Sequence, residues 1–285
     1  MQHVLGAGRA FLEREGRLLE RRLAEVLYDD GDPTGAVDAL LAYRNPDGGF
    51  GHGLEPDKRC PDSLPIDVER ALDVLVVARD GRVDEIVRRA CDWLASVARD
   101  DGAVPLSFPV IEQHPRAEHW TEWTYEPGLN PTAGVAGRLH RLGSTHPWLE
   151  RATAWTWERL DRGFDEDAHA LVEVLEFLAH VPDRARAEAV PVGDWLEGLA
   201  WFRADPDDPG YGVTPLHLAS RPDSPWRALF DDATIDGHLD RLSRDQQDDG
   251  GWPISWEPPG VASTMEWRGI ETLRALRVLA AYGRL

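Results

Sequence analysis

The chain is poor in the features that mark secreted, disulfide-bonded or membrane-spanning proteins. Its 285 residues include two cysteines, Cys60 and Cys91, which are too few and too poorly spaced for a disulfide framework or a structural zinc site. No stretch approaches the roughly 18 apolar residues of a membrane span. The N-terminus lacks a basic region followed by an apolar core, so no signal peptide is predicted. These absences together favour a soluble, cytoplasmic protein.

Positive charge is also scarce. Lys58 is the only lysine, and 31 basic residues stand against 51 acidic ones, which gives a net charge of −20. Because such a chain is repelled by phosphates, no nucleic acid partner is expected, and a solvated acidic surface accounts for the balance. The preference for arginine over lysine is typical of high-G+C coding and indicates no function. No Ser/Gly linker or low-complexity run divides the chain, which favours one domain over residues 1–285 and leaves the oligomeric state open.

A short motif recurs along the chain, and its clearest copy is Asp248-Asp249-Gly250-Gly251-Trp252. Glycine ends a helix in a left-handed cap, the acid accepts backbone N–H groups in the turn, and the aromatic ring fills the gap between neighbouring hairpins. We therefore interpret these positions as fold residues, with Phe50, Tyr211 and Trp252 in equivalent places. The spacing of roughly 40–60 residues is that of one helical hairpin. The residues in the aromatic slot are Phe50, Val104, Phe164, Tyr211 and Trp252.

Two kinds of predicted helix alternate between these markers. Residues 83–97, 12–26 and 148–160 each carry a single apolar stripe, which predicts one wet face. Residues 71–78, 171–178 and 273–280 are apolar almost all round, which predicts burial on most sides. The alternation predicts an all-α fold, an α/α toroid of five or six hairpins in two concentric rings.

A second set of polar residues recurs at a fixed distance after the motif. Asp62, Asp223 and Thr264 each lie 12 positions after a residue of the aromatic slot. Because Asp and Thr are preferred at helix N-caps, each is predicted to open an inner helix.

The last repeat has a recognisable pattern. From Leu242 the order is Leu, three residues, Gln246, three residues, Gly250, one residue and Trp252. This resembles the Gln-Trp repeat of squalene-hopene and oxidosqualene cyclases, and the looser repeat of protein prenyltransferase β-subunits. The resemblance implies an α/α toroid that acts on an apolar, isoprenoid-like substrate by acid-initiated chemistry. It also implies a catalytic role for Asp62, because class II terpene cyclases place their acid at the start of an inner helix.

Cofactor expectations follow from the same resemblance. Protein prenyltransferases hold zinc with an Asp-x-Cys pair and a distant His, and neither Cys60 nor Cys91 has Asp two positions before it. No metal site and no cofactor are therefore predicted, although a diphosphate substrate would bring Mg²⁺ with it.

The loops that follow each motif join an outer helix to an inner one, so they are expected to emerge on one face of the ring. Glu55 and Glu257 each lie five positions beyond the aromatic slot and each precede proline. Together with Asp62 they are the candidate catalytic residues. The candidate substrate contacts on the same face are His52, Asp57, His119, Trp123, Glu126, His169, Trp256, Glu266 and Trp267.

Carboxylates among tryptophans suit more than one function. An apolar pocket raises the pKa of a carboxyl group until it is a general acid, and aromatic faces stabilise cations. A carbohydrate-active hydrolase on an (α/α)6 scaffold would use tryptophan platforms and paired carboxylates equally well. A non-catalytic module that recognises a cationic partner is the third reading, and structural Glu-Pro turns with packed tryptophans are the fourth. A small-molecule substrate is the expected partner, and the fold alone does not choose among these functions.

Overall fold

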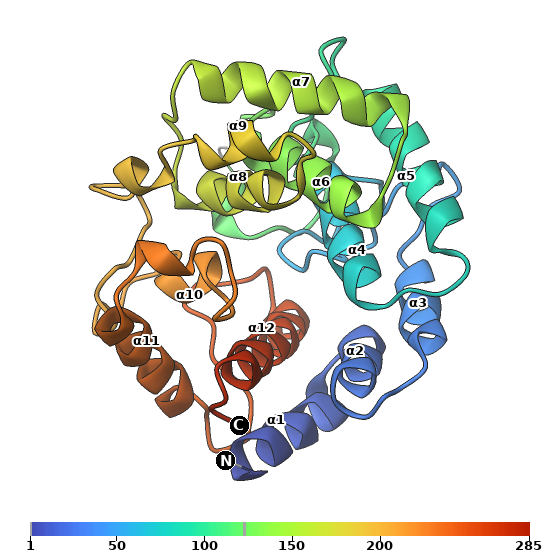
Figure 1. The fold of residues 1–285 in the computed structure, drawn as a ribbon. Coiled ribbons are helices and arrows are strands. Elements are labelled where there is room, and N and C mark those ends of the chain that lie inside the picture. The colour runs from blue at the N-terminus through green and yellow to red at the C-terminus, as the bar shows by residue number, and fades with distance from the viewer. Residues whose placement is uncertain (1, 122–123) are drawn as a thin grey trace.

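The computed structural model describes residues 2–121 and 124–285, and the helices in these ranges confirm the predicted all-α fold (Figure 1). Extended pairing in the same ranges is limited to isolated bridges. The α-helices are α1 (Gln2–Glu15), α2 (Leu18–Tyr28), α3 (Pro33–Leu41), α4 (Pro65–Val77), α5 (Val83–Val97), α6 (Leu129–Leu142), α7 (Pro147–Asp161), α8 (Ala168–His180), α9 (Arg184–Glu188), α10 (Pro215–Leu218), α11 (Asp232–Arg244) and α12 (Val261–Ala281). The 3₁₀ helices are η1 (Pro109–Gln113), η2 (Glu118–Trp120), η3 (Val192–Trp195) and η4 (Arg227–Leu229).

The helices form a ring of hairpins. The even-numbered helices lie toward the middle, and α1, α3, α5, α7 and α11 lie around them (Figure 1). Each inner helix packs on the next along the series α12, α2, α4, α6, α8 and α10. Helix α1 packs on α12, which closes the ring and brings the two ends of the chain together (Figure 1). The architecture is therefore a toroid with two layers of helices.

The hydrophobic pattern explains which helix occupies which layer. Helix α5 buries one stripe that includes Val83, Ile86 and Val87, while α8 buries residues on most of its sides. The expectation of one continuous helix over residues 12–26 is wrong, because the chain turns at Gly16 and Arg17 between α1 and α2. A Cβ at Gly16 would lie 2.7 Å from the Leu12 carbonyl oxygen, so only glycine permits this break.

The Asp-Gly turns share one backbone geometry. Gly48, Gly102 and Gly250 have φ values of +98°, +93° and +92°, the left-handed region that favours glycine. In each turn the preceding acid accepts a backbone N–H from two residues further on, at 2.9 Å for Asp47, 3.1 Å for Asp101 and 3.0 Å for Asp249. The turn role of these acids and glycines is confirmed. The predicted helix cap is wrong, because the helices end earlier, at Leu41, Val97 and Arg244.

These turns also join neighbouring outer helices. A Cβ at Gly250 would lie 2.2 Å from the carbonyl oxygen of Ala7 in α1, so the turn after α11 seals the ring against its first helix. The turns after α3 and α5 abut the next outer helix in the same way, through Gly48 against Arg89 and Gly102 against Ala152.

The residue in the aromatic slot is buried in some copies of the motif and exposed in another. Phe50 and Val104 are fully buried and Trp252 is 3% exposed, whereas Tyr211 is 39% exposed. The predicted equivalence of Tyr211 with Phe50 and Trp252 is therefore wrong. The physical reason is local, because the loop that carries Tyr211 does not directly follow an outer helix and leads only to the four-residue helix α10.

The predicted helix caps at the second set of polar residues are also wrong. Helix α4 begins at Pro65 with Leu64 in the N-cap position, which leaves Asp62 outside the helix and exposed. Asp223 lies in a turn, and Thr264 lies within α12. Proline at the first helical position fixes the start of α4, because its ring presets the backbone angle that the helix needs.

No helix in the described part of the chain is long and apolar enough to cross a membrane.

Candidate functional site

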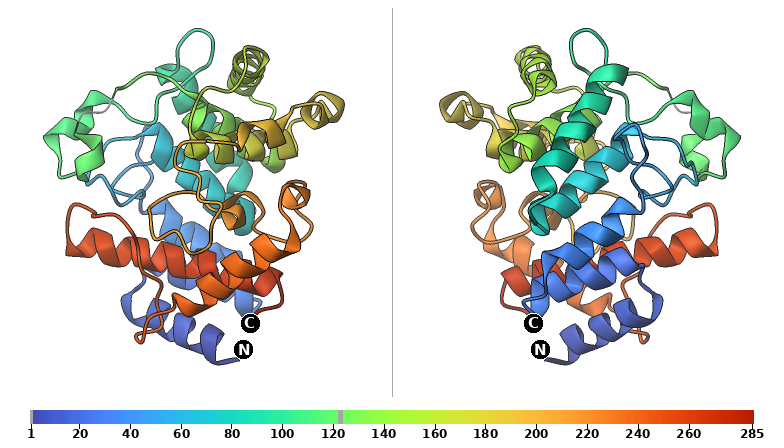
Figure 2. Two further views of the ribbon diagram at one scale, coloured as in Figure 1. Left: turned by 90° about the vertical axis from the view of Figure 1, so that its left-hand side faces the viewer. Right: turned by 90° about the vertical axis from the view of Figure 1, so that its right-hand side faces the viewer.

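Loops that lead into α4, α6 and α12 project from the same side of the ring (Figure 2). Two of them are held together by short antiparallel pairing. The Ala117 N–H donates to the Asp57 carbonyl at 2.8 Å, and the Arg59 N–H donates to the Pro115 carbonyl at 2.9 Å. Because the backbone fixes this pairing, the side chains of both loops have defined positions.

Asp57 is the centre of a polar cluster on this side. The Asp57 residue is buried, with 4% of its surface exposed. The indole N–H of Trp267 donates to Asp57 Oδ1 at 2.7 Å, and that of Trp256 donates to the same oxygen at 3.2 Å. The Nε2 atom of His119 lies 3.3 Å from Asp57 Oδ2. The carboxylate therefore orients one half-exposed imidazole while the buried Trp267 indole and the half-buried Trp256 indole hold it in place.

A row of aromatic rings runs outward from this cluster, and we call Trp267, Trp256, Tyr211 and Trp201 the aromatic row. Consecutive ring centroids are 5.0, 5.7 and 6.0 Å apart, all in edge-on contact. The row begins at a buried ring and ends at Trp201, which is 49% exposed. His169 stacks on Tyr211, and its Nε2 atom lies 2.9 Å from the Tyr211 hydroxyl. We call the surface formed by the aromatic row, Asp57, His119 and His169 the mouth.

Carboxylates from three elements act on Tyr211. Burial, together with the charges of Asp57, Asp167 and Glu271, raises the pKa of Tyr211 to about 12. These three carboxylates come from the loop before α4, from the N-cap of α8 and from α12.

A second buried cluster lies beside Asp57 and contains the single lysine. The Lys58 ammonium donates to the Glu55 carboxylate, and it lies 4.0 Å from the centroid of the Trp120 ring. The Glu55 N–H donates to Asp67 Oδ1 at 2.7 Å. Burial raises the pKa of Asp67 to about 7, and the Lys58 charge opposes this rise. The sequence analysis assigned no role to Lys58. In the structure its charge neutralises the buried carboxylate of Glu55 at the edge of the mouth.

The raised pKa of Asp67 predicts a pH-dependent contribution to stability. The folded pKa of about 7 exceeds the usual 3.8, so between these values the folded chain holds a proton that the unfolded chain has released. Stability from this group is therefore lost as the pH rises from about 4 to about 7. Lys58, Glu55 and Arg17 are the charged groups that act on Asp67.

We expect the Asp67→Asn variant to lack this dependence. Urea unfolding of both proteins at several pH values would show the variant gaining stability relative to the wild type as the pH rises through the window. A difference that stays constant with pH would contradict the assignment.

Charge also fills the centre of the ring. Arg138 in α6 donates to Glu69 in α4 at 3.1 Å, to Glu173 in α8 at 2.6 Å and to Asp73 at 2.5 Å. Burial and the neighbouring Glu173 raise the pKa of Glu69 well above its ordinary range, and the Arg138 guanidinium opposes this rise. A Cβ at Gly134 would lie 1.7 Å from Glu173 Oε2, so glycine makes room for the cluster.

Two open hollows of about 440 and 460 Å³ lie on the outer surface and include no residue of the mouth. One is lined by Asp240, Ser243, Arg244 and Arg284, and the other by Gln246, Gln247, Asp248 and Asp249.

The structure brings six of the predicted site residues together. Asp57, His119, Trp256 and Trp267 form one bonded cluster, His169 joins it through Tyr211, and Glu55 lies beside it through the loop they share.

Other predicted residues lie apart from this group. His52 Nε2 lies 2.9 Å from Asn45 Oδ1 in the first Asp-Gly turn, and Glu266 pairs with Arg59 at 2.6 and 3.1 Å. Asp62 is exposed beside Cys60 and His114. Glu126 and Glu257 are exposed, so Glu257 shares the register of Glu55 but not its buried environment. Trp123 lies outside the described residues.

Sequence reasoning missed Asp67, Tyr211 as a site residue, and the Arg138 cluster. A signal existed for Lys58, since a lone lysine three positions after Glu55 fits a local ion pair. Asp67 gave no comparable signal, because an acid in the first turn of a helix is common.

Comparison with known proteins supports the fold. No family model and no curated protein matches the chain. A crystal structure of a protein from Actinoplanes superposes on it with a TM-score of 0.61 at 20% sequence identity, over 98% of this chain and 99% of that one. At this identity the likeness shows a shared helical architecture over the full length of both chains.

Proposed function

We propose that the mouth binds a saccharide and that the protein is a carbohydrate-active hydrolase on a toroid scaffold. The observation that carries the proposal is the aromatic row, which ends in two exposed rings and begins at a carboxylate held by two indole N–H groups. Aromatic faces pack against the apolar faces of sugar rings, while carboxylates and imidazoles accept and donate hydrogen bonds to hydroxyl groups.

The polar centre of the ring favours this substrate class. Arg138, Glu69 and Glu173 form a buried ion cluster between α4, α6 and α8. An apolar chain there would remove water from charged groups without replacing its hydrogen bonds, which is costly. Hydroxyl groups of a saccharide do replace those bonds.

The exposed polar groups of the mouth suggest their roles. His119 is oriented by Asp57 and half exposed, so it is the base that accepts a proton from the attacking water. Tyr211 keeps its proton at neutral pH because its pKa is about 12, and with His169 it donates to the leaving oxygen. The His119–Asp57 pair and the Tyr211–His169 pair thus take the places of the two carboxyl groups of an ordinary glycosidase.

One observation favours the acid-initiated, isoprenoid-like alternative. Asp67 lies in the first turn of inner helix α4, and its pKa of about 7 suits a general acid. Asp67 is 1% exposed, so that reaction would require the loop over it to open.

The two functions are separated by their substrates. The full chain would be incubated with soluble cello-, xylo-, malto- and chito-oligosaccharides, and separately with farnesyl diphosphate and Mg²⁺. New reducing ends support the hydrolase, and a cyclised or hydrated hydrocarbon supports the alternative. Binding of a saccharide without turnover would support the mouth as a saccharide-binding site and would contradict its role as a hydrolase.

Trp256→Ala is expected to weaken saccharide binding about two- to tenfold. Loss of one aromatic contact is worth about 0.5–1.5 kcal/mol, and 1.4 kcal/mol is about tenfold in Kd. Isothermal titration calorimetry, with whichever of these oligosaccharides the wild type binds, measures the change in Kd. Trp226→Ala is the matched control, because Trp226 is also half-buried but lies before η4, away from the mouth. Equal losses in both variants would point to general destabilisation.

A further inference from the structure

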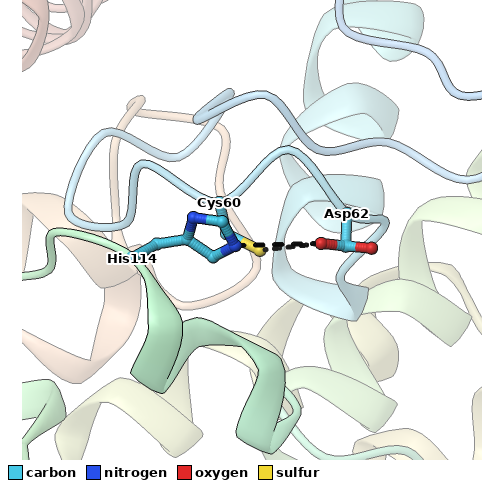
Figure 3. Close-up of side chains that lie close together, drawn as sticks. All are labelled: Cys60, Asp62 and His114. Atoms are coloured by element: carbon cyan, nitrogen blue, oxygen red, sulfur yellow. Dashed lines mark hydrogen bonds and ion pairs between the residues drawn. The ribbon is translucent and has the colours of Figure 1, made fainter.

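Three side chains with metal-binding atoms meet outside the mouth. Cys60 and Asp62 come from the loop before α4, and His114 follows η1 (Figure 3). The Cys60 Sγ atom lies 3.7 Å from Asp62 Oδ2, and His114 Nε2 lies 3.9 Å from the same oxygen. All three ligand atoms lie within 4.8 Å of one another.

The surrounding structure holds this cluster in position. Cys60 is fully buried in a small apolar cluster that also contains Leu64, Ile111 and Trp120. Asn45 Nδ2 donates to the Pro61 carbonyl at 2.9 Å and to Ser63 Oγ at 3.0 Å. The chain is therefore pinned on both sides of Asp62.

The His114 side of the cluster is fixed as well. The His114 N–H donates to the Ile111 carbonyl at 3.0 Å, and the next residue, Pro115, accepts from Arg59 at 2.9 Å. The first bond fixes His114 at the end of η1, and the second ties its loop to the loop that carries Cys60 and Asp62.

The distances fit a tetrahedral ion. Zinc binds sulfur at about 2.3 Å and nitrogen or oxygen at about 2.0–2.2 Å, so its ligand atoms stand roughly 3.3–3.7 Å apart. The Cys60–Asp62 distance already matches, and the His114–Asp62 distance needs to shorten by a few tenths of an ångström. Cys60 Sγ and His114 Nε2 lie within 4.8 Å of each other and need to come no more than about 1.5 Å closer. The Asp62 side chain is 56% exposed and that of His114 is 26% exposed, so an ion can enter from solvent.

We propose that Cys60, Asp62 and His114 bind Zn²⁺, with water in the fourth position. Thiolate and imidazole together select zinc or a similar borderline cation over Mg²⁺ and Ca²⁺, which prefer oxygen ligands. The ion joins the two loops that carry Asp57 and His119, so binding stiffens the base of the mouth. The site does not depend on the proposed substrate.

The arrangement also explains why the sequence indicated no metal. The Asp follows the Cys by two positions instead of preceding it, and His114 comes from a separate loop beyond α5. Only the paired loops bring the imidazole to the other two ligands.

Cobalt provides the test, because Co²⁺ bound to thiolate absorbs in the near ultraviolet and a tetrahedral site absorbs in the visible. The full chain, stripped with a chelator, would be titrated with Co²⁺ and then with Zn²⁺ as competitor. We expect one Co²⁺ per chain, loss of the thiolate band on addition of Zn²⁺, and a higher melting temperature with Zn²⁺.

Variants identify the ligands. Cys60→Ser should abolish the thiolate band, and Asp62→Asn and His114→Ala should weaken Zn²⁺ binding at least about tenfold. Cys91→Ser is the matched control, since Cys91 is the other buried cysteine and lies beside Ser144. Asp62 is exposed, so Asp62→Asn should keep the wild-type circular dichroism spectrum. A wild-type chain without the thiolate band, or a band that survives in Cys60→Ser, would overturn the proposal.

Discussion

Replacing Trp252 with alanine is expected to lower the free energy of unfolding by about 3–5 kcal/mol, the usual cost of deleting a large buried ring. Trp252 is 3% exposed, and its indole N–H donates to the Leu242 carbonyl at 2.8 Å. Its backbone N–H donates to Thr272 Oγ1 in α12 at 3.0 Å. The truncation leaves a cavity between α11 and α12. It also leaves the Leu242 carbonyl without this donor. Urea unfolding followed by circular dichroism measures the loss.

Tyr211→Ala is the matched comparison, because Tyr211 occupies the same place in the repeat but is 39% exposed. We expect this variant to keep nearly all of the stability and to lose saccharide affinity through the aromatic row. If Trp252→Ala unfolded at the same urea concentration as the wild type, the structural assignment of the motif would fail.

Arg138→Met is expected to cost about 3–5 kcal/mol, because removal of one partner leaves buried charge without compensation. The Arg138 side chain is 10% exposed and donates to Glu69, Glu173 and Asp73. Without the guanidinium, Glu69 and Glu173 remain side by side in the core of the ring. They must then take up protons or draw water inward, and either change destabilises the folded state.

Arg141→Met is the control on the same helix. Arg141 is 39% exposed and lies 3.6 Å from Glu176, so the change should cost no more than about 1 kcal/mol. Adding Glu69→Gln to Arg138→Met should recover part of the loss, because it removes one of the uncompensated acids. Equal costs for Arg138→Met and Arg141→Met would show that the central cluster contributes nothing beyond a surface pair.

Parts of the candidate site were predicted because they follow directly from repeat position. Glu55, Asp57 and Trp256 lie in loops that the motif register assigns to one face, and the structure places them near one another. Asp62, Glu126 and Glu257 are exposed instead, since position in the chain fixes the loop but not whether a side chain turns inward. That direction depends on the available partners, such as Lys58 for Glu55.

The sequence by itself determined the helices and the turns between them, because those depend on contacts within a few residues. Apolar spacing assigned residues 83–97 to the outer layer and 171–178 to the inner one, and the Asp-Gly pairs marked turns that only glycine adopts. Only the tertiary structure decided which side chains meet in the candidate site. Asp57 meets Trp256 and Trp267 across 199 and 210 residues of chain, and no local pattern encodes contacts of that range. Burial of Lys58 and of Asp67 likewise arises from loops that close over them, because burial is a property of the packed ring and not of any one segment.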